Sequence, residues 1–487
     1  MSSTLSAAHA ALTDLHARFA LACAGNRIDT VRSELFLPGA QINLQDVAMT
    51  VHLFHSPHLI VSPDAQSACV TWESYSYWKD GSTSSMCTTR FTAAAQLCQD
   101  GRWRYGDAEW ILIQRFRPLS FAPEQDTQAV LCPVWEGGDL PGPHDCQVLR
   151  NLAGTLAAGN WRGCADFFTA DAEADLEGLT QGSIPVIDWL QSVQDYERYN
   201  GGRYRCLMLL GPGALRLDSP NTASGAWTVQ TFEVGGTSDA QCLSRRFCLL
   251  TLTFERGQDT WLISALRLTA LQALPVILGS GTRYERMSSP ESNWLYTVYH
   301  PDTPCEEDAH DVENIFSLWP VSVHRGELMN FFYAYLCQPD TVLSIRSQGP
   351  QTPAKVGTDE ITGKLSGMDG MFRLGQITYH CATTPVIEEL QPGLIRASWI
   401  DHSLTNQGPR ADGSAGYMVF VTRYDHVFRR IDGRWYLTSF GWEPCLGIPD
   451  ESFVSLPSPG SWTTDHPEER YPLPLGLDAI AQSEDDL

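Results

Sequence analysis

The chain has 487 residues, of which 43% are hydrophobic and 18% are charged, a composition typical of globular domains. At roughly 150 residues per domain, this length indicates about three domains. The chain has 57 acidic and 33 basic residues, and its net charge of -24 makes nucleic acid an unfavourable partner.

No membrane span is expected, because no run of apolar residues approaches the length needed to cross a bilayer. The apolar run at 19–24 follows Asp14, His16 and Arg18, which stand where a secretory signal has its apolar core, so we predict a helix there. The 14 cysteines include no CxxC pair, which disfavours zinc or redox chemistry. We therefore expect reduced thiols and a cytoplasmic location.

One signature occurs three times along the chain. A proline is followed 14 or 15 residues later by a tryptophan, then by an arginine-aromatic pair and a second tryptophan. The prolines lie 155 and 173 residues apart, too far for solenoid repeats, so each copy is predicted to be a domain. The copies are Pro57, Trp72, Arg90-Phe91, Trp103; Pro212, Trp227, Arg246-Phe247, Trp261; and Pro385, Trp399, Arg423-Tyr424, Trp435.

The copies and the segments between them define the expected organisation. The expected parts, in order, are a first domain with a shortened helical half (1–118), a proline-rich linker (119–143), a second domain (144–275), an aromatic and acidic arm (276–319), a third domain (320–448) and an acidic, proline-rich tail (449–487).

The second copy shows the order of elements within a domain most completely. Helices are predicted first and strands afterwards, which is the α+β pattern of helices packed on one face of an antiparallel sheet. The predicted helices are 145–158 and 185–199, and the predicted strands are 205–210, 225–234, 244–255 and 260–270.

The run His380–Glu389 and the later Asp432-Gly433-Arg434-Trp435 resemble the NTF2-like superfamily, and most closely its SnoaL-like branch. The resemblance covers about residues 5–118, 144–275 and 320–448. It implies three tandem cone-shaped domains, each a bent antiparallel sheet packed on helices around an apolar pocket. It also implies that cones pair through their sheets, so two are expected to pair within the chain and the third to pair across chains in a homodimer.

Two copies carry a histidine five residues before the repeated proline. These are His52 and His380, whereas the second copy has Leu207. The resemblance implies proton transfer by a histidine near this point, and the near-neutral pKa of imidazole suits that task. The alternative is a structural, hydrogen-bonded histidine.

The third copy offers the most partners for such a histidine and is the preferred active site. Asp401 and His402 are neighbours on a predicted strand, so they point to opposite faces and at most one lines the pocket. A pair of His402 and His380 would resemble the arrangement of scytalone-dehydratase-like enzymes. The candidate catalytic residues are His380, His402, Tyr333, Tyr335, Asp401, Tyr424 and His52.

No cofactor or metal is expected. The cluster His52, His55 and His58 has no acid or cysteine at ligand spacing. The repeated tryptophans are expected in the core, and the repeated arginines at the interfaces between the cones.

The predicted function is that of a cofactor-independent lyase (dehydratase) or isomerase. It would act on a small hydrophobic metabolite by histidine and tyrosine acid-base chemistry in the third domain, with the second domain structural. The alternative is a non-catalytic small-molecule-binding or scaffold protein, because a fold alone does not settle function.

Overall fold

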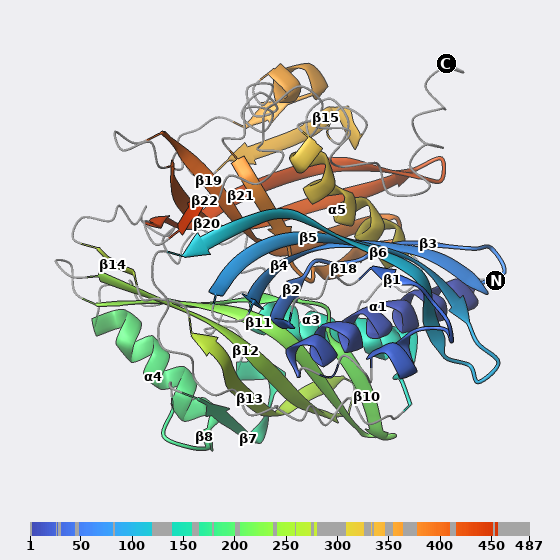
Figure 1. The fold of residues 1–487 in the computed structure, drawn as a ribbon, viewed down its shortest axis with the longest axis horizontal. Helices are drawn as coiled ribbons and strands as arrows, with labels where there is room; N and C mark the ends of the chain where they lie inside the picture. The colour runs from blue at the N-terminus through green and yellow to red at the C-terminus, as the bar shows by residue number, and fades with distance from the viewer. Residues whose placement is uncertain are drawn as a thin grey trace.

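The structure is a computed structural model. It describes residues 2–25, 27, 31–43, 48–80, 83–118, 139–157, 165–177, 180–199, 205–236, 241–258, 260–273, 277–279, 308–325, 333, 336–345, 354–363, 377–409, 415–450 and 453–455. This part of the chain is rich in strands and contains three sheets of seven, eight and seven strands (Figure 1).

The first unit combines helix α1 (Ser2–Ala24) with the first seven-stranded sheet. Alanines favour the helix, and buried ones such as Ala17 and Ala20 let neighbouring elements approach closely. A short helical segment, η1 (Val31–Leu35), follows. The strands are β1 (Ile42–Asn43), β2 (Ala48–Phe54), β3 (His58–Val61), β4 (Ser67–Asp80), β5 (Thr83–Leu97) and β6 (Trp103–Pro118).

The second unit contains the eight-stranded sheet. Its predicted helices and strands are present, but two further strands at 168–176 and 184–185 precede its last helix, so the helices do not all come first. Its helices are α3 (Pro143–Ala157), the 3-10 helix η3 (Ala165–Phe167) and α4 (Val186–Tyr199). Its strands are β7 (Phe168–Leu176), β8 (Ile184–Pro185), β9 (Arg205–Leu210), β10 (Ala214–Ser219), β11 (Thr222–Gly236), β12 (Gln241–Arg256), β13 (Trp261–Ala273) and β14 (Ile277–Gly279).

The third unit begins earlier than the sequence predicts. Helix α5 (Asp308–Arg325) crosses the boundary expected at 319/320 and packs on β17 and β19, so the end of the expected arm is the first helix of this unit. The strands are β15 (Cys337–Ile345), β16 (Lys355–Val356), β17 (Ile377–Ala382), β18 (Val386–Gln391), β19 (Leu394–Pro409), β20 (Ala415–Ile431) and β21 (Arg434–Asp450). Strand β22 (Phe453–Ser455), in the expected tail, pairs with β6 of the first sheet.

The three sheets share one topology. Each contains a meander of three long antiparallel strands, namely β4-β5-β6, β11-β12-β13 and β19-β20-β21. Two short strands pair with the first long strand, and an earlier strand pairs in parallel with the last one. The repeat in the sequence is therefore a repeat in the strand order.

The repeated tryptophans lie in the three cores, as expected. All six are at most 6% exposed. The first tryptophan of each copy pairs across the strands with Phe91, Leu250 and Tyr424 respectively. In the second copy the residue opposite the tryptophan is therefore Leu250 and not Phe247, so the Arg246-Phe247 pair lies three residues before the position that corresponds to Arg90-Phe91 and Arg423-Tyr424.

The expectation for the repeated arginines is only partly met. Arg90 and Arg423 are buried on the sheet face opposite to the tryptophans, but Arg90 pairs with Glu73 of the adjacent strand in its own sheet at 2.6 Å. Arg246 instead pairs with Glu233 of its own unit, because it lies opposite Thr231, four residues after Trp227, and so on the tryptophan face of the sheet. Arg245, its neighbour on β12, is buried.

One kind of contact joins each unit to the next. Asn314 on α5 pairs with both backbone groups of Leu59 on β3, at 2.8 and 2.9 Å. Asn151 on α3 pairs in the same way with Ile387 on β18, at 2.7 and 2.9 Å. A side-chain amide thus satisfies a buried backbone group of the neighbouring unit in both cases.

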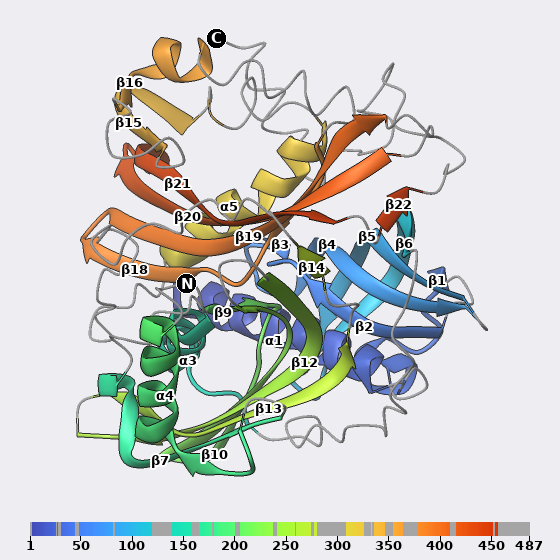
Figure 2. The same cartoon turned by 90° about the vertical axis from the view of Figure 1, so that its left-hand side faces the viewer.

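The third contact closes a ring. Asp14 on α1 accepts a hydrogen bond at 3.0 Å from the backbone N–H of Leu215 on β10. The first helix of each unit therefore contacts the equivalent short strand of the next unit, and Figure 2 shows the three sheets arranged around one another. A head-to-tail contact that recurs three times and closes gives a three-membered ring within one chain.

The repeated prolines lie where the units meet, and all three are buried. The Ser56 N–H donates to the Ala382 carbonyl at 3.3 Å, and the Thr384 N–H donates to the Leu210 carbonyl at 3.0 Å. The chain before each proline therefore forms the backbone contacts between units.

The outer faces of the three sheets, opposite to the repeated tryptophans, also meet. The His402 ring lies 4.9 Å from the Tyr75 ring and 5.4 Å from the Phe232 ring. One apolar cluster contains residues of all three sheets. The expectation that two units pair and the third is left unpaired is therefore wrong.

The repeated Trp227 leaves no room for a side chain at Gly213. A Cβ atom at Gly213 would overlap the fully buried Trp227 indole. We predict that Gly213→Ala lowers the free energy of unfolding by about 1–3 kcal/mol in a urea titration. Gly142→Ala is the control, because a Cβ atom there meets nothing, and equal stability of the two variants would contradict this packing.

Candidate functional site

A histidine-aspartate pair lies on the inner face of the third sheet, the face that carries Trp399. His380 on β17 and Asp401 on β19 have their Nδ1 and Oδ2 atoms 2.8 Å apart. The other carboxylate oxygen accepts the Cys381 backbone N–H at 2.9 Å. His380 is 6% exposed and Asp401 is fully buried. In a neutral ring, a proton on Nδ1 would be donated to this carboxylate, and Nε2 would then be the nitrogen that can accept a proton.

The alternation of the strand separates Asp401 from His402. Asp401 shares the inner face with Trp399, whereas His402 points to the rings of Tyr75 and Phe232 in the other units. Burial and, after it, the charge of Arg245 together lower the pKa of His402 to about 3. His402 and His380 therefore do not form the expected two-histidine arrangement.

The sheet register aligns the copies better than their prolines do. His380 and His52 each pair with a serine four residues after the repeated tryptophan. In the second unit the residue four places after the repeated tryptophan is Thr231, and it pairs with Met208 and not with Leu207. Met208 is 1% exposed within the second core, which agrees with a structural position in that copy.

The acid belongs to the third copy alone. Two residues after the repeated tryptophan, the first and second copies have Ser74 and Val229 in place of Asp401. At this pair of positions the first copy therefore has a histidine and a serine, and the second copy has a methionine and a valine. The third copy has a histidine and an aspartate. Only the last combination can fix the tautomer of a base.

Aromatic side chains surround the pair in the third core. The Trp319 ring lies 5.0 Å from the His380 ring and 4.9 Å from the Tyr424 ring, and its Nε1 donates to the Tyr333 hydroxyl at 3.1 Å. Burial raises the pKa of both tyrosines, and the charge of Asp401 adds to the rise at Tyr424. Both hydroxyls are therefore protonated near neutral pH and can donate hydrogen bonds.

Two members of this site were not predicted. Trp319 lies in the segment that was assigned to an arm. His426 is fully buried, and its ring lies 4.6 Å from that of Trp399. Burial lowers its pKa to about 3, so it is neutral. His426 follows Tyr424 by two residues on β20, and that spacing could have identified it.

Two predicted residues lie at least partly outside the described part of the chain. His52 lies on β2, but its side chain is outside the described residues, as is all of Tyr335. His58 contacts Ser317 Oγ on α5 at 3.1 Å.

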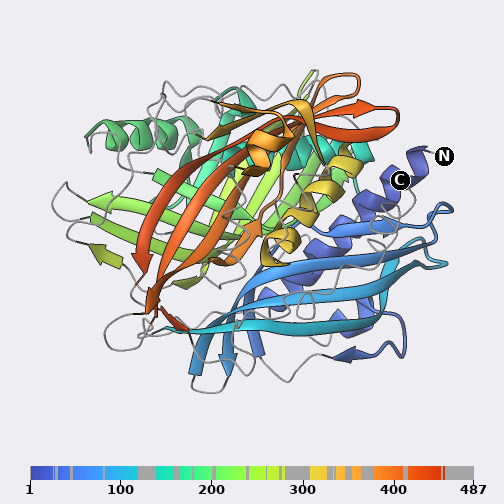
Figure 3. The same ribbon diagram turned by 90° about the horizontal axis from the view of Figure 1, so that it is seen from above.

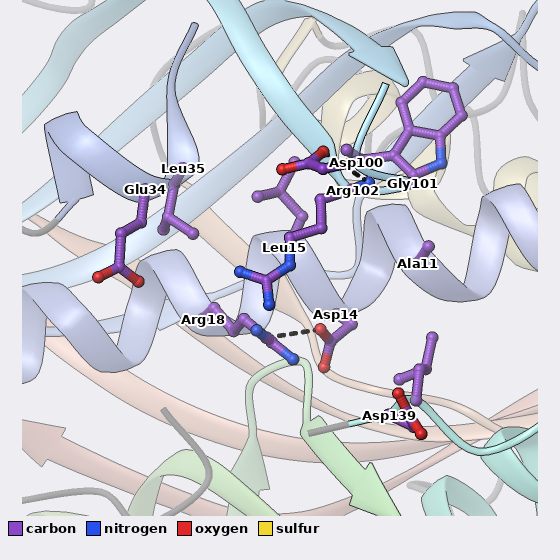
Figure 4. Close-up of a pocket in the computed structure, with 12 residues that line it drawn as sticks. Ala11, Asp14, Leu15, Arg18, Glu34, Leu35, Asp100, Gly101, Arg102 and Asp139 are labelled. Carbon is purple, nitrogen blue, oxygen red and sulfur yellow. Dashed lines mark hydrogen bonds and ion pairs between the residues drawn. The ribbon is translucent and has the colours of Figure 1, made fainter. Parts of the chain in front are cut away.

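An open cleft lies elsewhere, beside α1 (Figure 4). Its volume is about 380 Å³, and charged side chains of the first unit form much of its wall. The Arg18 guanidinium already pairs with Asp14 at 2.7 Å, and that of Arg104 pairs with Asp100 at 2.6 Å. A polar groove of paired charges is a poorer ligand site than an apolar interior with a few polar groups.

Comparisons with known proteins concern one unit at a time. No protein-family model matches the sequence, and no curated protein matches it. A hexachlorocyclohexane dehydrochlorinase of Novosphingobium barchaimii is 13% identical with a TM-score of 0.25, covering 31% of this chain and 95% of its own. An NTF2-like protein of unknown function from Shewanella oneidensis is 12% identical with a TM-score of 0.22, covering 28% of this chain and 98% of its own.

The chain resembles NTF2-like proteins. The activity must be argued from the residues of this chain. Within the described residues, no helix is both long and apolar enough to cross a membrane.

Proposed function

We propose that the chain consists of three SnoaL-like cones and that the third is a cofactor-independent lyase or isomerase for a small hydrophobic molecule. The buried His380-Asp401 pair on an aromatic inner face carries this proposal. The other two copies keep the scaffold without the pair, and so serve to hold the third in the ring.

His380 is the proposed base. Its Nε2 removes a proton from a carbon beside an electron-withdrawing group, and that C–H electron pair forms a double bond. A hydroxyl on the next carbon leaves with its bonding electrons and takes the proton back from the imidazolium, so that water is released. Tyr424 donates a hydrogen bond to the negative charge that develops on the substrate oxygen.

A non-catalytic binding or scaffold role is the second candidate. The first core supports it, because aromatic rings fill its inner face. The Phe19 ring lies 5.4 Å from that of Phe91 and 5.6 Å from that of Trp110. An interior filled in this way is typical of a structural core.

A small apolar probe separates the two candidates. A base that removes the ring C–H proton of a nitrobenzisoxazole breaks its N–O bond and releases a coloured phenolate with a nitrile. We expect the protein to open this ring about 100-fold or more faster than its His380→Ala variant.

The control is His402→Ala, because His402 is as buried as His380 but faces away from the third core. Its rate per folded molecule should equal that of the unmodified protein. A rate no higher than that of buffer, or equal rates with and without His380, would contradict the enzyme and favour the scaffold.

A further inference from the structure

A second group of histidines and an acid lies between the units, away from the third core. His9 on α1 and His310 on α5 have stacked rings with centroids 3.9 Å apart. Glu313 follows His310 by three residues, so both side chains lie on the same face of α5. His9 Nε2 is 3.9 Å from Glu313 Oε2, and the candidate ligand atoms of all three side chains lie within 4.8 Å of one another.

The group is buried without enough protein partners. His9 is 3% exposed and Glu313 is 6% exposed. Neither nitrogen of His9 has a hydrogen-bond partner. A buried polar group without a partner is destabilising, and such a group commonly contacts a bound ion or water.

The chemical state of these side chains suits a metal. Burial lowers the pKa of His9 well below its usual value and that of His310 to about 4, so both imidazoles are neutral and can bind a metal ion. Burial raises the pKa of Glu313 to about 7, so its carboxylate forms readily near neutral pH when a cation offers it a partner.

Two other side chains face the group. Arg150 on α3 donates to the Ala10 carbonyl at 3.3 Å, and its charge lowers the pKa of both Glu313 and His9. His58 also lowers the pKa of His9, while its own Nδ1 contacts Ser317 Oγ. The positive charge of Arg150 repels a cation. The binding of the ion by one carboxylate and two imidazoles must therefore be stronger than this repulsion.

We propose that His9, His310 and Glu313 bind one zinc ion between the first helices of the first and third units. Two imidazoles and a carboxylate are a common zinc ligand set, and they leave a fourth position for water. The ion would fasten the ring at the point where α1 meets α5, with α3 beside them. The spacing of His310 and Glu313 is visible in the sequence, but His9 is about 300 residues away and only the fold brings it to them.

The test is a zinc titration of the untagged, full-length chain after treatment with a chelator. Calorimetry should show one zinc ion per chain. Glu313→Gln and His310→Ala should each weaken binding by about 100-fold. Zinc should also raise the melting temperature of the unmodified chain and leave that of Glu313→Gln unchanged.

The matched control is His144→Ala, which removes an exposed histidine of α3 and should bind zinc like the unmodified chain. Circular dichroism of the metal-free variants reports whether they are folded. An unmodified chain that binds no zinc, or folded Glu313 and His310 variants that bind it undiminished, would overturn the proposal.

Discussion

The free energy of unfolding should fall steeply when the pH is lowered from about 7.5 to about 5.5. Burial lowers the pKa of six histidines, to about 4 or below where a value is given. In the unfolded chain, histidine titrates near about 6.5. The six are His9, His16, His58, His310, His402 and His426.

The sign follows from proton uptake. Below pH about 6.5 the unfolded chain binds protons that the folded chain excludes, so the stability from these groups is complete above that pH and is lost on acidification. Each group costs about 1.4 kcal/mol per pH unit in this range. Glu313 opposes them, because its raised pKa of about 7 makes the folded state bind a proton there. The net loss is several kcal/mol, comparable to the whole stability of many domains.

Urea unfolding at three pH values measures this loss. The variant His426→Phe isolates one group, since His426 packs against Phe428 and Phe440, and its pH dependence should be weaker by about 1.4 kcal/mol per pH unit. A stability that does not change with pH, or a variant with the same slope as the unmodified chain, would show that these histidines take up protons in the folded state.

Strand elements and cores were predictable here because their signals are local. The repeated tryptophans identified the meanders, and the strands of the second copy follow from alternation and turn residues. The position of Trp399 could also have predicted that Asp401 faces the core, because residues two places apart on a strand point to the same face of the sheet. Arg246-Phe247 shows the limit, because the strand pairing places Leu250 opposite Trp227 and the repeated motif does not reveal this offset of three residues.

The ring could not be predicted in the same way. The hydrogen bonds of Asp14 to Leu215 and of Asn151 to Ile387 join residues more than 200 positions apart, and each is a single polar side chain among buried neighbours. The periodic pattern of hydrophobic residues in the sequence does not indicate such a contact. His9 illustrates the same point, because it meets His310 and Glu313 only after α1 and α5 have been brought together.

The ring of three units also gives a physical reason why the chain contains two copies that lack the His380-Asp401 pair. β18, which follows the segment of His380, is held by Asn151 of the second unit, and the Ser56 N–H of the first unit donates to the carbonyl of Ala382, two residues after His380. The geometry of the third site therefore depends on both neighbours. A base that must stay within about 0.5 Å of its working position benefits from such support.

Asp401→Asn should abolish base catalysis by reversing the tautomer of His380. The asparagine carbonyl would keep the hydrogen bond from the Cys381 N–H, so its NH₂ group would face Nδ1 and donate to it. His380 would then carry its proton on Nε2, so Nε2 could no longer accept a proton from the substrate. We expect the ring-opening rate to fall about 100-fold or more, as in His380→Ala.

The position of the proton on the His380 ring is the measurement that would not change if Asp401 had only a structural role. Nitrogen NMR of the labelled protein should find the His380 proton on Nδ1 in the unmodified chain and on Nε2 in Asp401→Asn. Asp425→Asn is the matched control, because Asp425 accepts from Ser398 Oγ at 2.8 Å on neighbouring strands and faces away from the pair. If Asp401→Asn keeps both the Nδ1 proton and the rate, Asp401 does not position the base, and the third core loses the feature that distinguishes it from the other two.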